Sequence, residues 1–172
     1  MQSCKTRKHK MSEIPIHCQF SEMILTEKCI EHPKNANIHS KEQIERLASL
    51  IEHYGWRHPI IISAFSGYVV AGHARLAAAK LLKLEKIPVN FQDFSSVEEE
   101  YGFLIADNSI AFWAGLDLST INHTLPELGP DFNIDLLGIK DFTLDISEKV
   151  LEDEPKKTKS VTCPECKFEF TL

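Results

Sequence analysis

Hydrophobic residues recur along the chain first at helical and then at extended spacing, and the clearest stretch is helical. It lies between Ser40 and Gly55. Ser40 and Gln43 form a capping box at its start, and Gly55 is typical of the residue that follows a helix end. The apolar residues between them form one stripe: Ile44, Leu47, Leu50 and Ile51. This pattern predicts a helix over residues 40–54 with one buried face.

Short runs of β-branched and apolar residues predict strands on both sides of this helix. The predicted strands are 14–16, 23–25, 59–63, 68–70 and 86–90. Gly67 lies in the short connection between the third and fourth strands, which predicts a hairpin. Pro88 has no N–H group for a sheet ladder, so its strand is predicted near an edge.

Helical patterns dominate after the hairpin. An alanine-rich helix is predicted over 73–82, and Ser95 or Ser96 can cap another over 97–106. Residues 107–109 (Asp-Asn-Ser) are expected to break or cap that helix. Because of their helical spacing, Phe103, Phe112 and Trp113 are expected in the core. Shorter elements should follow: helices at 110–116, 119–125 and 132–137 and a strand at 142–144.

Charge and cysteine content narrow the function classes. The net charge is −6, with +4 on residues 1–10, −8 on 11–144 and −2 on 145–172. An acidic centre argues against tight, purely electrostatic DNA binding, which needs several Lys and Arg contacts to phosphates. The chain has five cysteines, no export signal and no apolar run of membrane-spanning length, so we expect a cytoplasmic protein.

Residues 68–80 describe a buried strand that stops at Gly72 and turns directly into a helix. The first N–H groups of such a helix lack partners, and its dipole favours an anion. His73 and Arg75 lie beside them. We therefore expect a nucleotide phosphate at this turn. The alternative is an ordinary strand-to-helix corner with a solvated Arg75, since one glycine is weaker evidence than a full Gly-rich fingerprint.

Three blocks, at 31–40, 72–80 and 106–111, occur in the order and with the character of the ParB/sulfiredoxin superfamily. The chain resembles the phage and mobile-element branch of this superfamily. The resemblance implies an α+β fold, with a small mixed sheet and packed helices. It also implies the following organisation: a basic arm at 1–13, a nucleotide-binding domain at 14–117, a helical extension at 118–144, a charged linker at 145–160 and a Cys-x-x-Cys tail at 161–172.

The resemblance further implies a site for a nucleoside triphosphate, with CTP as the first candidate, and Mg²⁺. The Gly-His-x-Arg turn matches the family's Gly-Glu-Arg-Arg box, which holds phosphates in CTP-binding partition proteins. Asp107 and Asn108 match a Glu-Asn pair that lies near the phosphates and the magnesium. The residues assigned in this way are Asn35, Asn37, His39, Gly72, His73, Ala74, Arg75, Asp107 and Asn108.

The chain also departs from the family pattern. His73 replaces a glutamate and Ala74 replaces an arginine, so Arg75 is the one permanent charge of the turn. This puts CTP switching in doubt, and phosphate affinity should fall as His73 loses its proton above about pH 6.5. The turn has no cysteine, so the peroxiredoxin-repair chemistry of sulfiredoxins is not supported.

Two classes of function stay open. The first is a ParB-like module that binds a nucleotide and acts in partition, phage methylation or transcription. Its partners would be DNA, reached directly or through a protein such as a methylase, and a second copy of the chain. The second is a nucleotide-dependent enzyme, an NTP hydrolase, nuclease or kinase, that uses the same site. The sequence does not decide whether the protein is an enzyme.

Cys163 and Cys166 form a Cys-Pro-x-Cys knuckle, which is typical of half a tetrahedral zinc site. A zinc ribbon needs a second pair, and the sequence ends at Leu172. Three arrangements stay open: a metal shared by two copies, ligands borrowed from upstream, or a relic that binds nothing. The other cysteines, Cys4, Cys18 and Cys29, form no second Cys-x-x-Cys motif.

Overall fold

In the computed structural model of the chain, residues 14–140, 160–162 and 169–171 are described. The chain divides into two compact units, Met1–Phe142 and Thr143–Leu172. The first contains a five-stranded sheet with helices, and the second contains a two-stranded sheet. No helix within the described ranges is long and apolar enough to cross a membrane.

The five-stranded sheet is mixed and has the strand order β1-β5-β3-β4-β2. Its strands are β1 (Glu22–Leu25), β2 (Ile30–Glu31), β3 (Ile60–Ser63), β4 (Tyr68–Ala71) and β5 (Lys86–Gln92). β3 and β4 form the predicted antiparallel hairpin, and β5 runs parallel to β3. β1 pairs antiparallel with β5, and β2 pairs parallel with β4. The predicted α+β class with a small mixed sheet is confirmed.

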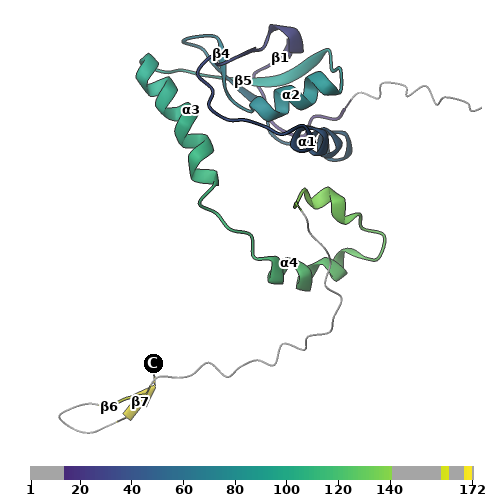
Figure 1. Cartoon of the computed structure of the whole chain (residues 1–172), viewed down its shortest axis with the longest axis vertical. Helices are drawn as coiled ribbons and strands as arrows, with labels where there is room; N and C mark the ends of the chain where they lie inside the picture. The colour runs from purple at the N-terminus through teal and green to yellow at the C-terminus, as the bar shows by residue number, and fades with distance from the viewer. Residues whose placement is uncertain (1–13, 141–159, 163–168, 172) are drawn as a thin grey trace, which may run out of the picture. The chain divides into compact units, whose positions relative to one another are not determined.

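Two helices, α1 (Lys41–Tyr54) and α2 (His73–Leu81), share one hydrophobic core with the sheet (Figure 1). Its buried members include Ala48 and Ile51 of α1, Leu76 of α2, and Ile60 and Val89 of the sheet. Even spacing along the strands puts Ile60 and Ile62 of β3, and Ile87 and Val89 of β5, on this face. The core thus fixes the start of α2 against the ends of β3 and β4.

The ends of α1 confirm the sequence prediction. The Ser40 hydroxyl oxygen accepts a hydrogen bond from the Gln43 N–H at 3.1 Å. Gly55 follows the helix with φ +72°, and a Cβ atom there would lie 2.4 Å from the Pro15 carbonyl oxygen. A side chain cannot fit at this position, so glycine is required both by the backbone angle and by the close approach of residue 15.

The predicted position of the fifth strand near an edge is wrong. β5 lies inside the sheet, between β1 and β3. Its ladder with β3 begins with Val89 opposite Ile60, and its ladder with β1 places Pro88 opposite Met23. Pro88 therefore precedes the β3 ladder, where a missing N–H group is tolerated. The long-range pairing, which the sequence does not reveal, decides the strand position.

The predicted helix break at 107–109 is also wrong. Helix α3 runs without interruption over Val97–Ala111 and carries Asp107 and Asn108 in its last turns. The Asn108 Nδ2 group donates a hydrogen bond to the Leu104 carbonyl oxygen within the helix, at 2.7 Å. Asp and Asn lower helix propensity only by a fraction of 1 kcal/mol, roughly 0.7, so they do not end a helix without Gly or Pro.

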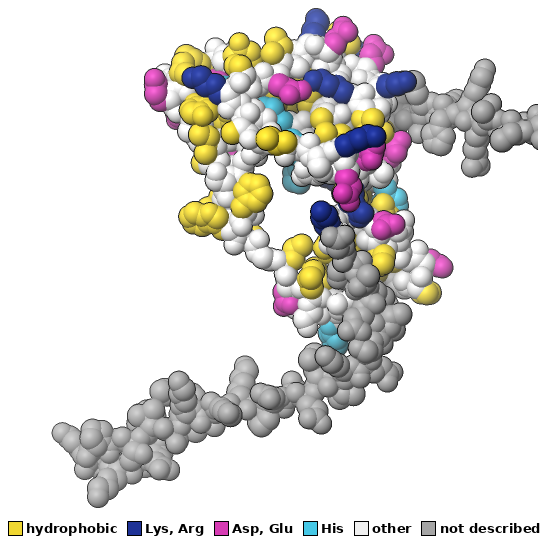
Figure 2. Space-filling model, viewed as in Figure 1, with side chains coloured by type: hydrophobic (Ala, Val, Ile, Leu, Met, Phe, Trp, Pro, Cys, Tyr) yellow, Lys and Arg dark blue, Asp and Glu magenta, His cyan; other side chains and the backbone are white. Residues whose placement is uncertain are grey.

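The expected aromatic cluster is only partly formed. Phe103 packs against Phe94, with ring centroids 5.5 Å apart. Phe112 and Trp113 are 82% and 83% exposed, because they follow the end of α3 instead of continuing its buried face. The helix predicted at 110–116 is therefore not formed. Figure 2 shows hydrophobic side chains exposed on the visible face of the molecule.

The remaining elements differ only in detail from the prediction. α4 (Leu118–Thr124) is confirmed, and it continues into the 3₁₀ helix η2 (Leu125–Leu128). The piece expected at 132–137 is the 3₁₀ helix η3 (Ile134–Leu137). At 14–16 only a single bridge forms, between Ile16 and Trp56. The sequence missed β2 and the 3₁₀ helix η1 (Thr26–Lys28).

The second unit contains strands β6 (Ser160–Thr162) and β7 (Glu169–Thr171), which pair antiparallel. Cys163 and Cys166 lie outside the described residues. So do the arm at 1–13, the strand expected at 142–144 and the linker up to residue 159.

Candidate functional site

The candidate site is built around Gly72, which joins β4 to α2. Its backbone is left-handed, with φ 99° and ψ 26°, and no side chain caps the helix that follows. A Cβ atom on Gly72 would lie 3.2 Å from both Nε and Nη2 of Arg75 and 3.3 Å from Cγ1 of Ile60. Glycine is therefore needed at position 72 for two reasons: it tolerates the left-handed backbone, and it leaves room for the Arg75 guanidinium against the turn.

Arg75 is half-buried beside this turn, and its Nη1 group donates a hydrogen bond to the Pro59 carbonyl oxygen at 2.9 Å. Burial lowers the pKa of Arg75, while the nearby Asp107 and Cys18 act in the opposite direction. A guanidinium has five N–H donors, so one bond to Pro59 leaves the group able to bind an anion. The Asp107 carboxylate of the third block is thus near enough to Arg75 for an electrostatic effect, without a hydrogen bond or ion pair between them among the described residues.

His73 is 6% exposed, and its Nε2 atom has no hydrogen-bond partner among the described residues. Burial lowers the pKa of His73 below its ordinary value of 6.5, and His39 and His32 lower it further. Glu31 and a hydrogen bond with the Val69 backbone oppose this shift. His73 therefore loses its charge at a lower pH than the sequence predicted. A buried polar atom without a hydrogen bond is unfavourable, so His73 Nε2 is a candidate contact for a ligand at this turn.

The loop of the first block lies near the same helix end. The Asn35 Oδ1 atom accepts a hydrogen bond from the Asn37 N–H at 3.1 Å, which shapes the loop. His39 Nδ1 lies 3.1 Å from Gln43 Oε1 of α1, and the electrostatic effect of His39 reaches His73. Ala74 is half-buried and offers only its backbone to a ligand.

An ion pair ties this loop to α2. The Lys80 Nζ group donates to Glu31 Oε1 at 2.7 Å, and this bond is the main cause that lowers the pKa of Glu31. The structure thus brings Glu31, His39 and His73 together on one side of α2. Sequence reasoning missed Cys18 and the Pro59 carbonyl as neighbours of Arg75, because no local motif marks contacts between such distant residues.

Asp107 and Asn108 can contribute to a magnesium site only together with a ligand. Successive residues of a helix point about 100° apart, so the two side chains do not face one ion jointly. No group of three or more His, Cys, Asp or Glu residues that could hold a metal exists in the described ranges. Asp107 is exposed, and its role as a Mg²⁺ ligand stays a prediction from the sequence.

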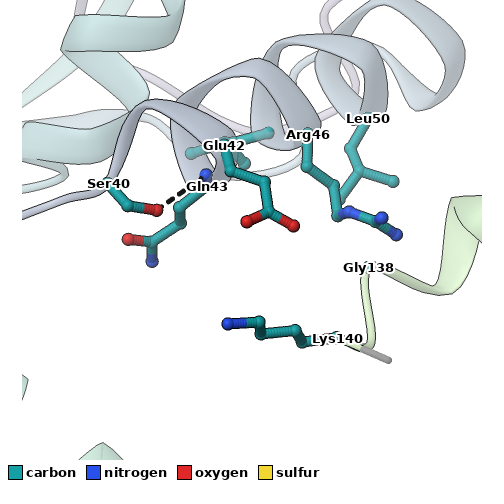
Figure 3. Close-up of a pocket in the computed structure, with 8 residues that line it drawn as sticks. Ser40, Glu42, Gln43, Arg46, Leu50, Gly138 and Lys140 are labelled. Atoms are coloured by element: carbon teal, nitrogen blue, oxygen red, sulfur yellow. Dashed lines mark hydrogen bonds between the residues drawn. The ribbon is translucent and has the colours of Figure 1, made fainter. Parts of the chain in front are cut away.

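A cavity of about 450 Å³ lies elsewhere, between polar and apolar side chains of α1 and the segment after η3. Figure 3 shows Glu42 and Arg46 extending from α1 towards the space that Lys140 enters from the other side. None of its lining residues belongs to the Gly72 turn: they are Ser40, Glu42, Gln43, Arg46, Leu47, Leu50, Gly138 and Lys140. The candidate site therefore rests on the side-chain geometry at α2 and not on this cavity.

Comparison with known proteins gives a consistent picture. Residues 21–108 match the model of the ParB N-terminal domain, a range that contains every candidate residue from Asn35 to Asn108. The ParB-like nuclease domain-containing protein YnaK of Escherichia coli K12 is 42% identical over 55 residues, which cover 32% of this chain and 62% of YnaK.

One solved structure supports the same fold, and a second one is reported with it. The C-terminally truncated chromosome-partitioning protein ParB from Caulobacter crescentus, complexed with CTP-gamma-S, is similar with a TM-score of 0.52 and 21% identity. The similarity covers 62% of this chain and 63% of that one. The same ParB complexed to the centromeric parS site has a TM-score of 0.44, with 19% identity over 63% of this chain and 58% of that one. The chain thus spans less than two thirds of each of these relatives.

Proposed function

Because the chain belongs to the ParB N-terminal domain family, we propose that it binds a nucleoside triphosphate at the Gly72 turn and acts in a DNA-associated process. CTP is the first candidate, since the similar Caulobacter ParB structure contains a CTP analogue. The observation that carries the proposal is the buried His73 Nε2 atom, which bonds to none of the described residues, at the start of α2, where no side chain caps the helix. A phosphate oxygen there would accept hydrogen bonds from the first N–H groups of the helix, and from His73 Nε2 only when the imidazole is protonated, so this contact should strengthen as the pH falls.

The turn would hold the phosphates with one permanent charge. Arg75 lies against Gly72 and has donors beyond its bond to Pro59. Ala74 adds no charge where the family has an arginine, so we expect weaker and more salt-sensitive binding than at a site with two arginines. Asp107 would hold Mg²⁺ through the phosphates, with Asn108 beside it.

The loop of the first block would close the site from the other side. His39 influences the pKa of His73, so this loop lies within electrostatic reach of the helix start. We therefore assign Asn35, Asn37 and His39 to the same ligand. Zinc at Cys163 and Cys166 remains a separate prediction, supported only by the sequence motif.

DNA is the proposed macromolecular partner of the protein. The acidic net charge of −6 disfavours DNA binding by the domain surface as a whole. Contact with DNA would therefore use the basic residues of the arm at 1–13, a second copy of the chain or a partner protein such as a methylase. Partition, phage methylation and transcription are the processes that this arrangement fits.

Calorimetry with each nucleoside triphosphate and Mg²⁺, with and without DNA, tests the proposal. Arg75→Ala should weaken binding at least tenfold, as expected when a charge-assisted contact worth about 1.5–3 kcal/mol is lost. Arg46→Ala is the matched control, because it removes the same charge from the α1 cavity. The proposal fails if no nucleotide binds at millimolar concentration, or if both variants weaken binding equally.

A second candidate is hydrolysis of the nucleotide at the same site. It is favoured by His73, whose lowered pKa keeps the imidazole neutral and able to accept a proton near pH 7. Phosphate release should be followed alongside binding. Turnover that disappears in His73→Gln while binding persists would identify an enzyme, and binding without turnover would identify a module.

A further inference from the structure

A buried carboxylate on α3 connects three separate parts of the fold. Glu100 is 2% exposed and lies against the β3–β4 connection and the start of the first-block loop. Its Oε2 atom accepts a hydrogen bond from the Ser63 hydroxyl at 2.5 Å, and Oε1 accepts one from the Ser66 hydroxyl at 2.8 Å. His32 Nε2 lies 3.2 Å from Oε1. These three partners replace the water that the carboxylate loses on burial, so Glu100 is part of the internal structure.

The direction of each proton in this network follows from the neighbouring bonds. The Ser63 hydroxyl oxygen already accepts from the N–H groups of Phe65 and Ser66, so its own proton points to Glu100. His32 Nδ1 accepts from the Lys34 N–H at 3.1 Å, so the His32 proton lies on Nε2, facing Glu100. Both Glu100 oxygens thus act as acceptors, as an ionised carboxylate does.

Aromatic contacts hold His32 in this orientation. Its ring lies edge-on to Tyr68 of β4 at 5.5 Å and stacks on Tyr101 of α3 at 6.3 Å, measured between ring centroids. Lys34 Nζ lies 5.3 Å from the centre of the Tyr101 ring. The start of the first-block loop is therefore docked on α3, next to Glu100.

Glu100 also shares a helix face with the magnesium candidate. Asp107 follows it by seven residues, which is nearly two full turns, so both side chains point to the same side of α3. Leu104, which lies between them on this face, is 2% exposed. The anchoring of α3 at Glu100 therefore fixes the side to which Asp107 points.

From this arrangement we propose that Glu100 is a positioning residue for the nucleotide site. Through His32 it holds the loop that carries Asn35, Asn37 and His39, and along α3 it fixes the side of the helix on which Asp107 lies. This inference rests on the proposed nucleotide binding at the Gly72 turn. Glu100 itself touches no ligand in this scheme, and its role is to keep the two other blocks in place.

The test compares the full chain with His32→Leu and with His32→Gln, which keeps an N–H group able to reach Glu100. Calorimetry with CTP and Mg²⁺ measures affinity, and hydrogen exchange of the ligand-free proteins measures opening of residues 33–39 and of α3. We expect His32→Leu to weaken CTP binding at least fivefold, within the usual range of coupling between sites, and to speed exchange in both segments. His32→Gln should stay within about threefold of the unchanged chain by the same reasoning.

Thr26→Val is the matched control. Thr26 is also buried and donates its hydroxyl hydrogen bond to the Leu84 carbonyl oxygen, beyond the other end of α2. This variant should lose thermal stability and keep its affinity for CTP. If His32→Leu does not fold, Ser63→Ala replaces it, since it removes one of the bonds to Glu100.

The outcomes separate the two proposals. CTP binding that His32→Leu leaves unchanged refutes the positioning role and leaves the proposed function intact. Equal weakening by Thr26→Val also refutes it, because general destabilisation would then explain the loss. If the unchanged chain binds no CTP, the proposed function fails first, and the role of Glu100 at that site fails with it.

Discussion

Replacement of Gly72 by alanine should destabilise the protein more than the same change at a glycine with a positive φ angle and no neighbouring atoms, such as Gly67. A left-handed backbone costs a residue with a Cβ atom about 1–2 kcal/mol. The new Cβ atom would also lie 3.2 Å from the Arg75 guanidinium, which is held by its bond to Pro59. Displacement of Arg75 from that bond should cost about 1.5–3 kcal/mol more, so we expect a total loss of about 2.5–5 kcal/mol.

Gly67→Ala is the matched control for this prediction. Gly67 also has a positive φ, of +79°, but nothing lies within 4 Å of a Cβ atom placed there. Urea unfolding of both variants should give a loss of only about 1–2 kcal/mol for Gly67→Ala. Equal losses in the two variants would show that Arg75 does not pack against the turn in solution, and the argument for the anion site would lose its geometric basis.

Four further predictions follow from local contacts. Burial lowers the pKa of His73, so the free energy of unfolding of the protein should be highest above pH 6.5 and should fall below it, as the buried imidazole takes up a proton. Urea unfolding of His73→Gln from about pH 5 to 7.5 should show a flatter pH profile than that of the unchanged chain. An unchanged profile would contradict the burial. The hydrogen bond from Lys80 lowers the pKa of Glu31, so the stability that this ion pair provides should be present above pH 4.5 and disappear as the pH falls. Glu31→Gln should therefore weaken the loss of stability in acid. A stability curve of this variant parallel to that of the unchanged chain would contradict the prediction. Ser96→Ala removes the hydroxyl that caps α3 and should lower the free energy of unfolding by about 1 kcal/mol, whereas no change would mean that the cap is not formed. If the tail binds zinc, Cys163→Ser should abolish zinc retention in a metal assay, and equal retention would exclude this knuckle.

The features that the sequence predicts correctly are determined by nearby residues. The cap of α1 needs only Ser40 and Gln43, three positions apart. The Gly72 turn follows from a strand, one glycine and an alanine-rich run, and the structure confirms this strand-to-helix turn, with a left-handed backbone at Gly72 that the sequence did not predict. Such features can be predicted from the sequence because they depend on backbone geometry within one turn of the chain.

The features that the sequence misses depend on distant partners. Glu98, Glu99 and Glu100 are equivalent acidic residues in the sequence, yet Glu100 is buried against Ser63, 37 residues away. Pro88 suggests an edge, but the pairing of β5 with two neighbours places it inside the sheet. The bond from Arg75 to Pro59 is equally invisible to any motif. Long-range contacts of this kind are decided by topology, which local propensity does not specify.

The uninterrupted course of α3 has a mechanical consequence. Residues 100 and 107 are separated by about 10 Å of rigid helix, at 1.5 Å per residue. A tilt of about 10° at the buried carboxylate would therefore move the aspartate by about 2 Å, roughly the length of a bond between Mg²⁺ and oxygen. With a helix break at 107–109, as the sequence suggested, this lever would be absent. Under the proposed function, the continuous helix would convert a small rotation at its anchored end into the gain or loss of a contact between Asp107 and Mg²⁺.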